Sequence, residues 1–121
     1  MVKEEADNAD IEEALKKNAE EFLESAEQDL KKARYNSAVS SYFKAIAVLC
    51  DLKIYEIRRL LPKSHTERFL FLSTNLKEAY DLINPIFKKY TSSYNLRLNK
   101  EDALLLKENV KKIKKIFGFK N

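Results

Sequence analysis

Apolar side chains recur at every third or fourth position over the first third of the chain, and mostly charged residues fill the positions between them. The apolar positions are Ile11, Leu15, Ala19, Phe22, Leu23, Ala26, Leu30 and Ala33. A stripe of this kind predicts an amphipathic helix. Asp10 precedes the stripe and has the side chain of a typical N-cap. We therefore expect a helix from Asp10 to about Ala33, with residues 1–9 frayed.

A second stripe begins after the pair Asn36-Ser37, either member of which can cap a new helix. Its centre, from Ala45 to Cys50, is apolar on nearly every side, which indicates a buried helix. A proline pushes the residue before it out of the helical conformation. We therefore expect this helix to run to about Leu61, just before Pro62.

A third stripe follows Ser64, whose spacing from Glu67 is that of a capping box. Its inward positions are Phe69, Leu72, Leu76, Ala79, Tyr80 and Ile83. We expect Asn84-Pro85 to interrupt this helix. Residues 86–98 are less periodic and predict one short helix followed by a loop at residues 91–93.

The last helix has a start signal and a stop signal. Asn99 and Asp102 are spaced to cap its first turn, and Gly118 stands where a left-handed C-cap belongs. Its inward positions are Ala103, Leu106, Val110, Ile113 and Phe117. The whole pattern predicts an all-α, up-and-down bundle of four to five helices. The 121 residues fit one domain, which we place at residues 10–121.

The composition excludes several classes of function. Gly118 is the only glycine, whereas P-loops, dinucleotide-binding loops and tight β-hairpins need glycine at particular dihedral angles. Cys50, the single cysteine, cannot form an internal disulfide, and no Cys/His cluster has the spacing of a zinc site. We expect a reducing, cytoplasmic setting with no metal and no other cofactor. No apolar run approaches the ~18 residues of a membrane span, so we expect no membrane partner.

Charge is distributed unevenly along the chain. Residues 1–33 contain five lysines against eleven acidic residues, whereas the rest of the chain contains 18 basic against 8 acidic residues. A basic segment is typical either of polyanion binding or of a solvated, lysine-rich helix face. Both interpretations stay open at this point.

Several short motifs follow one another in a recognisable order. They are Phe22-Leu23-x-x-Ala26-x-x-Asp29-Leu30-x-x-Ala33, then Tyr35-Asn36-Ser37-Ala38 with Tyr42, then Lys63-Ser64-His65, and finally Tyr90, Tyr94 and Arg97 before the helix capped by Asn99. In order and spacing the chain resembles a HEPN (higher eukaryotes and prokaryotes nucleotide-binding) domain. The resemblance implies a dimer of four- or five-helix bundles. It further implies either a ribonuclease with an Arg-x(4–6)-His motif or a catalytically silent, toxin–antitoxin-like partner of a nucleotidyltransferase.

The ribonuclease motif is not found at the place where the resemblance would put it, because no histidine follows Arg97. Arg59 and His65 have the required spacing, but they lie between the second and third expected helices with Pro62 between them. Histidine is the natural base for RNA cleavage near neutral pH. We therefore assign no catalytic residue, and a ribonuclease that uses Arg59 and His65 is the alternative interpretation.

Five residues are candidates for binding a nucleotide or RNA. Tyr90, Tyr94 and Arg97 share one weakly periodic segment, and Arg58 and Lys63 lie near His65 in the sequence. An aromatic ring can stack on a base, and an arginine fork can pair with a phosphate. The first interpretation is thus a non-catalytic, homodimeric binding or regulatory module for nucleotide or RNA.

A third interpretation is a tetratricopeptide-like scaffold for protein interaction. Ala26, Ala38, Tyr42 and Ala45 fall where that repeat places its small and aromatic packing residues. Such repeats need about three copies to bury a continuous core, and one unit is recognisable here. This interpretation ranks behind the resemblance to HEPN domains.

Overall fold

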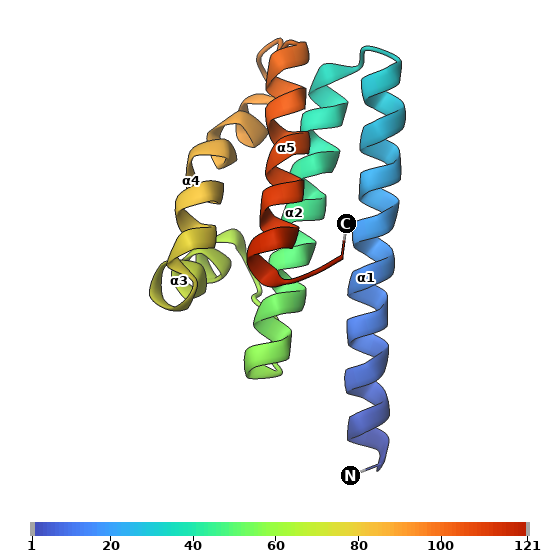
Figure 1. Ribbon diagram of the computed structural model, residues 1–121, viewed down its shortest axis with the longest axis vertical. Coiled ribbons are helices and arrows are strands. Elements are labelled where there is room, and N and C mark those ends of the chain that lie inside the picture. The colour runs from blue at the N-terminus through green and yellow to red at the C-terminus, as the bar shows by residue number, and fades with distance from the viewer. Residues whose placement is uncertain (1, 121) are drawn as a thin grey trace.

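The protein is a bundle of five α-helices, seen in Figure 1 as a computed structural model that describes residues 2–120, with side chains from residue 8 onward. Met1 and Asn121 lie outside the described residues. The helices are α1 (Val2–Lys31), α2 (Tyr35–Arg58), α3 (His65–Asn75), α4 (Lys77–Ser92) and α5 (Lys100–Phe117). No strand occurs among residues 2–120. The predicted all-α bundle is confirmed.

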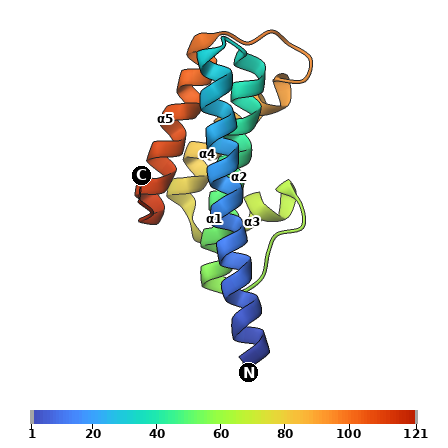
Figure 2. The same ribbon diagram turned by 90° about the vertical axis from the view of Figure 1, so that its right-hand side faces the viewer.

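Helix α2 is the central element. It lies between α1 on one side and α4 on the other, and α5 runs along it (Figures 1 and 2). The short α3 packs mainly against α4. Residues of α2 make up much of the core, among them Val39, Tyr42, Phe43, Ile46, Leu49 and Cys50. The apolar run that marked this helix in the sequence therefore marks the centre of the molecule.

Helix α1 begins at Val2, two turns before the expected N-cap at Asp10. Residues 2–9 contain neither glycine nor proline, so nothing in their sequence stops the helix at Asp10. The segment expected to be frayed is therefore helical from residue 2. In Figure 1 this end of α1 projects beyond the end of α2.

The turn between α1 and α2 lies where the pattern placed it, but its capping differs. Ala33 has a positive φ of 58°, and the Arg34 N–H donates to the Asp29 carbonyl at 2.8 Å. Helix α2 starts at Tyr35 with Arg34 as its N-cap, and no side chain caps it. The expectation that Asn36 or Ser37 caps this helix is wrong, because Asn36 is engaged in a distant contact described below.

Helix α2 ends at Arg58, before the expected end at Leu61. Arg59 adopts the left-handed conformation with φ 57°, and its N–H donates to the Tyr55 carbonyl. Its guanidinium lies over the Tyr55 ring and pairs with Glu12 of α1. The helix therefore ends at this C-cap, three residues before Pro62, and the proline is not what terminates it.

The break between α3 and α4 falls at Leu76, not at Asn84-Pro85. The Leu76 N–H donates to Leu72 of α3, and its carbonyl accepts from Tyr80 of α4, so this one residue joins the two helices. Pro85 lies inside α4 and is exposed. The carbonyl that loses its partner there belongs to Asp81, which is also exposed, so water can bind it.

The end signals of α5 are confirmed. The Asn99 side chain accepts from the Asp102 N–H at 3.0 Å, and Asp102 accepts from the Asn99 N–H at the same distance. Gly118 takes the left-handed conformation with φ 77° and lets the chain turn away after Phe117. At α3 the Ser64 hydroxyl accepts from the Glu67 N–H, whereas the Glu67 carboxylate accepts from Lys63 instead of Ser64.

Candidate functional site

The loop between α4 and α5 is held against the start of α2 by one asparagine. The Asn36 side-chain amide donates to the Ser93 carbonyl at 2.9 Å and to the Leu96 carbonyl. Its oxygen accepts from the Leu98 N–H at 3.0 Å. Three hydrogen bonds thus place residues 93–98 at the end of the bundle where α1 turns into α2.

This loop presents Tyr94 and Arg97 to solvent. Tyr94 is 70% exposed, and its hydroxyl hydrogen-bonds the Tyr90 hydroxyl at 2.9 Å. The Tyr90 ring is half-buried and stacks on Phe43, with ring centroids 4.6 Å apart. Burial and the hydrogen bond to Tyr94 raise the pKa of Tyr90 to about 12, so its phenol stays protonated. Arg97 is exposed and makes no hydrogen bond or ion pair with any described side chain.

Beside Tyr94 lies a polar depression of about 470 Å³ that we call the serine–lysine notch. Its α2 wall contains Asn36 together with Ser37, Ser40, Ser41 and Lys44, and these last four share one face of the helix. Lys44 is exposed and has no ion-pair partner among the side chains that the structure describes. The one acidic residue in the lining, Asp29, is paired with Arg34 at 3.7 Å.

The notch offers donors suited to an anion. Three hydroxyls and an ammonium group can each donate to a phosphate oxygen. The exposed face of Tyr94 next to them can stack on a base. These serines were not among the residues predicted from the sequence to bind a ligand. The available signal was a face of four polar residues in the first half of a helix whose centre is apolar.

Arg58, another expected ligand residue, lies at the far end of α2. Arg58 ends this 24-residue helix, and at 1.5 Å per residue it is about 21 Å along the axis from Lys44 and about 32 Å from Ser37. Its guanidinium lies over the Phe71 ring, 5.3 Å from the centroid. Lys63 is exposed in the loop that follows. The structure therefore brings Tyr90 and Tyr94 into contact and separates them from Arg58. Arg97 is exposed in the same loop as Tyr94. Lys63 precedes by two residues His65, whose ring is 6.0 Å from that of Tyr90.

Arg59 and His65 have different partners. The Arg59 Nη1 atom is 2.7 Å from Glu12 Oε1, which directs this side chain toward α1. His65 is the first residue of α3, and its ring lies 5.1 Å from Phe87 and 6.0 Å from Tyr90 of α4. The structure shows no contact between Arg59 and His65.

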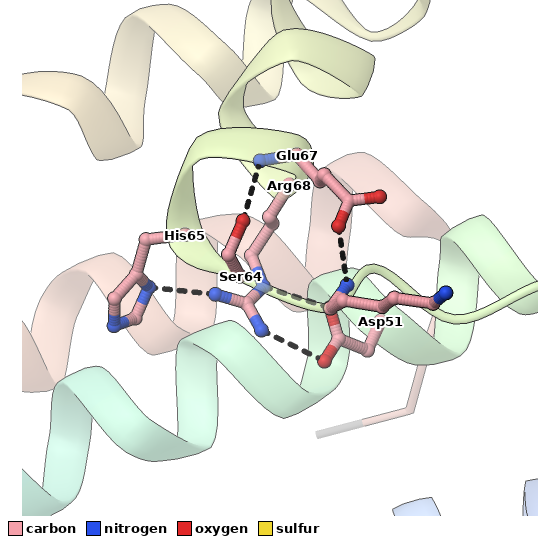
Figure 3. A network of polar contacts seen from close by, with 6 residues as sticks. Asp51, Ser64, His65, Glu67 and Arg68 are labelled. Atoms are coloured by element: carbon pink, nitrogen blue, oxygen red, sulfur yellow. Dashed lines mark hydrogen bonds and ion pairs between the residues drawn. The ribbon is translucent and has the colours of Figure 1, made fainter.

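His65 belongs to a polar network drawn in Figure 3. Its Nδ1 atom lies 2.6 Å from Nη1 of Arg68, and Arg68 in turn makes a two-point contact with Asp51 of α2. An arginine can only donate, so His65 Nδ1 accepts and the ring proton is on Nε2. Burial and the Arg68 charge lower the pKa of His65, so the ring is neutral at pH 7.

This protonation state matters for catalysis. A general base needs a free lone pair within reach of the proton it removes. The lone pair of neutral His65 already accepts from Arg68, and its other nitrogen is a donor. The network is suited to fixing the start of α3 on α2. Among residues 8–120 no group of three His, Cys, Asp or Glu side chains is placed to hold a metal ion.

No protein-family model, no curated protein and no solved structure matches this chain. The resemblance to HEPN domains therefore remains a prediction from the motifs. Over residues 2–120, none of the helices has the length and apolar character needed to cross a membrane.

Proposed function

We propose that the protein is a non-catalytic, HEPN-like module that binds a nucleotide or the phosphates of RNA in the serine–lysine notch. The observation that carries this proposal is the coincidence of Lys44, three serine hydroxyls and the exposed Tyr94 ring in one depression. Arg97 comes from the same loop as Tyr94 and is free to pair with a further phosphate. The excess of basic residues in positions 34–121 favours an anionic ligand.

The state of His65 supports binding without turnover. Cleavage of RNA without a metal needs a base for the 2′-hydroxyl proton and a cation near the phosphate. Neutral His65 has its acceptor nitrogen engaged by Arg68, and Arg59 pairs with α1. Pairing with a nucleotidyltransferase rests on the family resemblance alone.

We also infer that the protein is a homodimer. Four aliphatic side chains are exposed where α2 passes into α3, and we call Ile57, Leu60, Leu61 and Leu70 the corner patch. Leu60 and Leu61 lie around one shallow pocket with Glu67 and Phe71, and Leu70 shares the α3 face of those two residues. Exposed apolar groups gathered in this way are typical of interaction surfaces.

A fluorescence titration tests the binding proposal. A labelled nucleotide and a short labelled RNA are titrated at low and high salt with the native protein and with Lys44→Ala, Tyr94→Ala and Tyr94→Phe. We expect binding that weakens with salt, because each phosphate contact releases a counterion. Lys44→Ala should weaken it about fivefold and Tyr94→Ala about tenfold, while Tyr94→Phe keeps the stacking ring.

Lys112→Ala is the matched control, because Lys112 is an exposed lysine of α5 that lies outside the notch. An equal loss of affinity in Lys44→Ala and Lys112→Ala would show that Lys44 acts only as general surface charge and that the notch is not the binding site. Absence of binding at low salt would end the proposal. An RNA cleavage assay runs alongside, and cleavage that disappears in His65→Ala would establish the ribonuclease alternative.

A further inference from the structure

A long cleft separates α1 from α5. Both helices pack along α2, which forms the floor between them (Figure 1). The cleft consists of two depressions of about 430 and 390 Å³, and both are lined by Leu23 and Lys114, so they are continuous. We call it the α1–α5 cleft. It shares no lining residue with the serine–lysine notch.

The floor of the cleft is apolar. Leu23 comes from α1, Leu49 and Leu52 from α2, and Val110 from α5. The chain turns at Gly118 and crosses from the end of α5 toward α1, as Figure 1 shows, so that Phe119 lines the lower end. A nucleic acid would meet few polar groups on this floor, whereas an apolar side chain would be removed from water.

The α5 wall of the cleft is basic. Lys107, Lys111 and Lys114 are spaced four and three residues apart, which places their ammonium groups in a row along the helix. Lys107 pairs with Glu27 across the cleft at 3.2 Å. Lys111 and Lys114 have no ion-pair partner among the described residues. Glu20 and Glu56 also line the cleft, so its lining contains five lysines against three glutamates and is basic overall.

We propose that the α1–α5 cleft is the docking site for an acidic amphipathic helix of a partner protein. The α5 side of the cleft extends from Lys107 to the C-cap Gly118, which at 1.5 Å per residue is about 16 Å, or three helical turns. A helix laid along it would place leucine-type side chains on the floor. Its acidic side chains at helical spacing would meet Lys111 and Lys114, and it would complete a four-helix arrangement with α1, α2 and α5.

The probe for the test is a labelled synthetic helix of about four turns, with leucines along one face and glutamates beside them. Its binding to the full chain is measured by fluorescence anisotropy. A second peptide replaces each glutamate with lysine, and a third carries a central proline that breaks the helix. We expect saturable binding of the acidic helix and at least about tenfold weaker binding of the other two.

The protein variants make the test specific to one face of α5. Lys111→Glu combined with Lys114→Glu reverses the charge of the cleft wall. Lys112→Glu combined with Lys115→Glu makes the same change on exposed lysines of the same helix that line no part of the cleft. We expect the first pair to weaken binding about tenfold and the second less than about twofold, with both variants folded by circular dichroism.

Three results would overturn the proposal. The first is the absence of saturable binding of the acidic helix, and the second is an equal loss of binding in the two double variants. The third is a self-association of the native protein that only Lys111→Glu with Lys114→Glu abolishes, because a second copy of the chain would then occupy the cleft.

Discussion

Arg68 of α3 and Asp51 of α2 form a two-point ion pair, with Nε 2.7 Å from Oδ1 and Nη2 3.0 Å from Oδ2. The two side chains are only 12% and 14% exposed. A charge at such a site is stabilised by its partner and is poorly compensated when the partner is removed. This pair, together with His65, attaches the short α3 to the central helix.

Removing the Asp51 carboxylate should therefore destabilise the folded protein. We expect Asp51→Ala to lower the free energy of unfolding by about 3 kcal/mol, because Arg68 is left without its partner. Asp81→Ala is the matched control, since the Lys77–Asp81 pair is well exposed and contributes about 0.5 kcal/mol or less. Urea denaturation of both variants measures the difference. Similar losses in the two variants would show that the Asp51–Arg68 pair is no more important than a surface pair.

His65 should make stability depend on pH. Its pKa in the folded protein lies below the ordinary value of 6.5, because of burial first and of the Arg68 charge second. The unfolded chain therefore binds a proton more readily than the folded chain between these two values. We expect the free energy of unfolding to fall as the pH decreases through this window and to be restored on return to neutral pH.

His65→Phe should remove this part of the pH dependence while keeping an aromatic ring among Phe43, Phe87 and Tyr90. Urea denaturation of both proteins between pH 7 and pH 5 gives the comparison. The carboxyl of Asp102 does not interfere, because its hydrogen bonds from Lys89 and Asn99 hold its pKa below the ordinary 3.8. If the free energy of unfolding depends on pH identically in the two proteins, His65 is not the titrating group.

Cys50 should be inert in the native protein. Its side chain is fully buried in α2, and this burial raises the pKa of the thiol far above its ordinary value. Only the thiolate is an effective nucleophile. We expect a thiol reagent at pH 8 to label the protein no faster than global unfolding exposes Cys50. Rapid labelling without denaturant would indicate that α2 opens locally around this position.

Leu49 lies in the core on the central helix. Its replacement by alanine leaves a cavity, and we expect Leu49→Ala to lower the free energy of unfolding by about 2–5 kcal/mol. Leu104→Ala on the exposed face of α5 should change it by less than about 1 kcal/mol. Chemical denaturation of the two variants provides the measurement. A small effect at Leu49 would contradict the central place of α2.

The corner patch should decide the oligomeric state. Leu60 and Leu70 are 72% and 67% exposed, and we expect light scattering to give twice the monomer mass of 14.2 kDa for the native protein. Leu60→Glu should return it to a monomer, because a charge would then be buried in the interface. Leu105→Glu, at another exposed leucine, should leave the dimer intact. A native monomer at high micromolar concentration, or a dimer sensitive only to Leu105→Glu, would refute the inference.

Structural features that depend on residues close together in the sequence were predictable. The apolar stripes indicated the helices, the run around Ile46 indicated the central one, and Asn99 with Asp102 and Gly118 marked both ends of α5. These signals act within one or two turns of the chain, so the sequence alone carries them. The pattern also predicted the amphipathic stripe that α3 and α4 share, but it did not predict the break between these two helices at Leu76.

Features that depend on distant contacts were not predictable. Asn36 looked like a cap, and its actual partners lie 57–62 residues away. The pattern put the helix break at Pro85, whereas the chain breaks after Ser73-Thr74-Asn75, three residues with a weak preference for helix. The notch was missed because its serines become a site only when the loop carrying Tyr94 is placed beside them.

The three hydrogen bonds of Asn36 also bear on how the chain folds. They close a loop of about 60 residues that contains nearly all of α2, all of α3 and α4, and the approach to α5. Closing a loop of that length lowers the conformational entropy of the chain, and only the contacts of an assembled bundle can offset this cost. The Asn36 contacts should then form late, after α1 and α2 have paired, so that the serine–lysine notch is completed only in the fully folded chain.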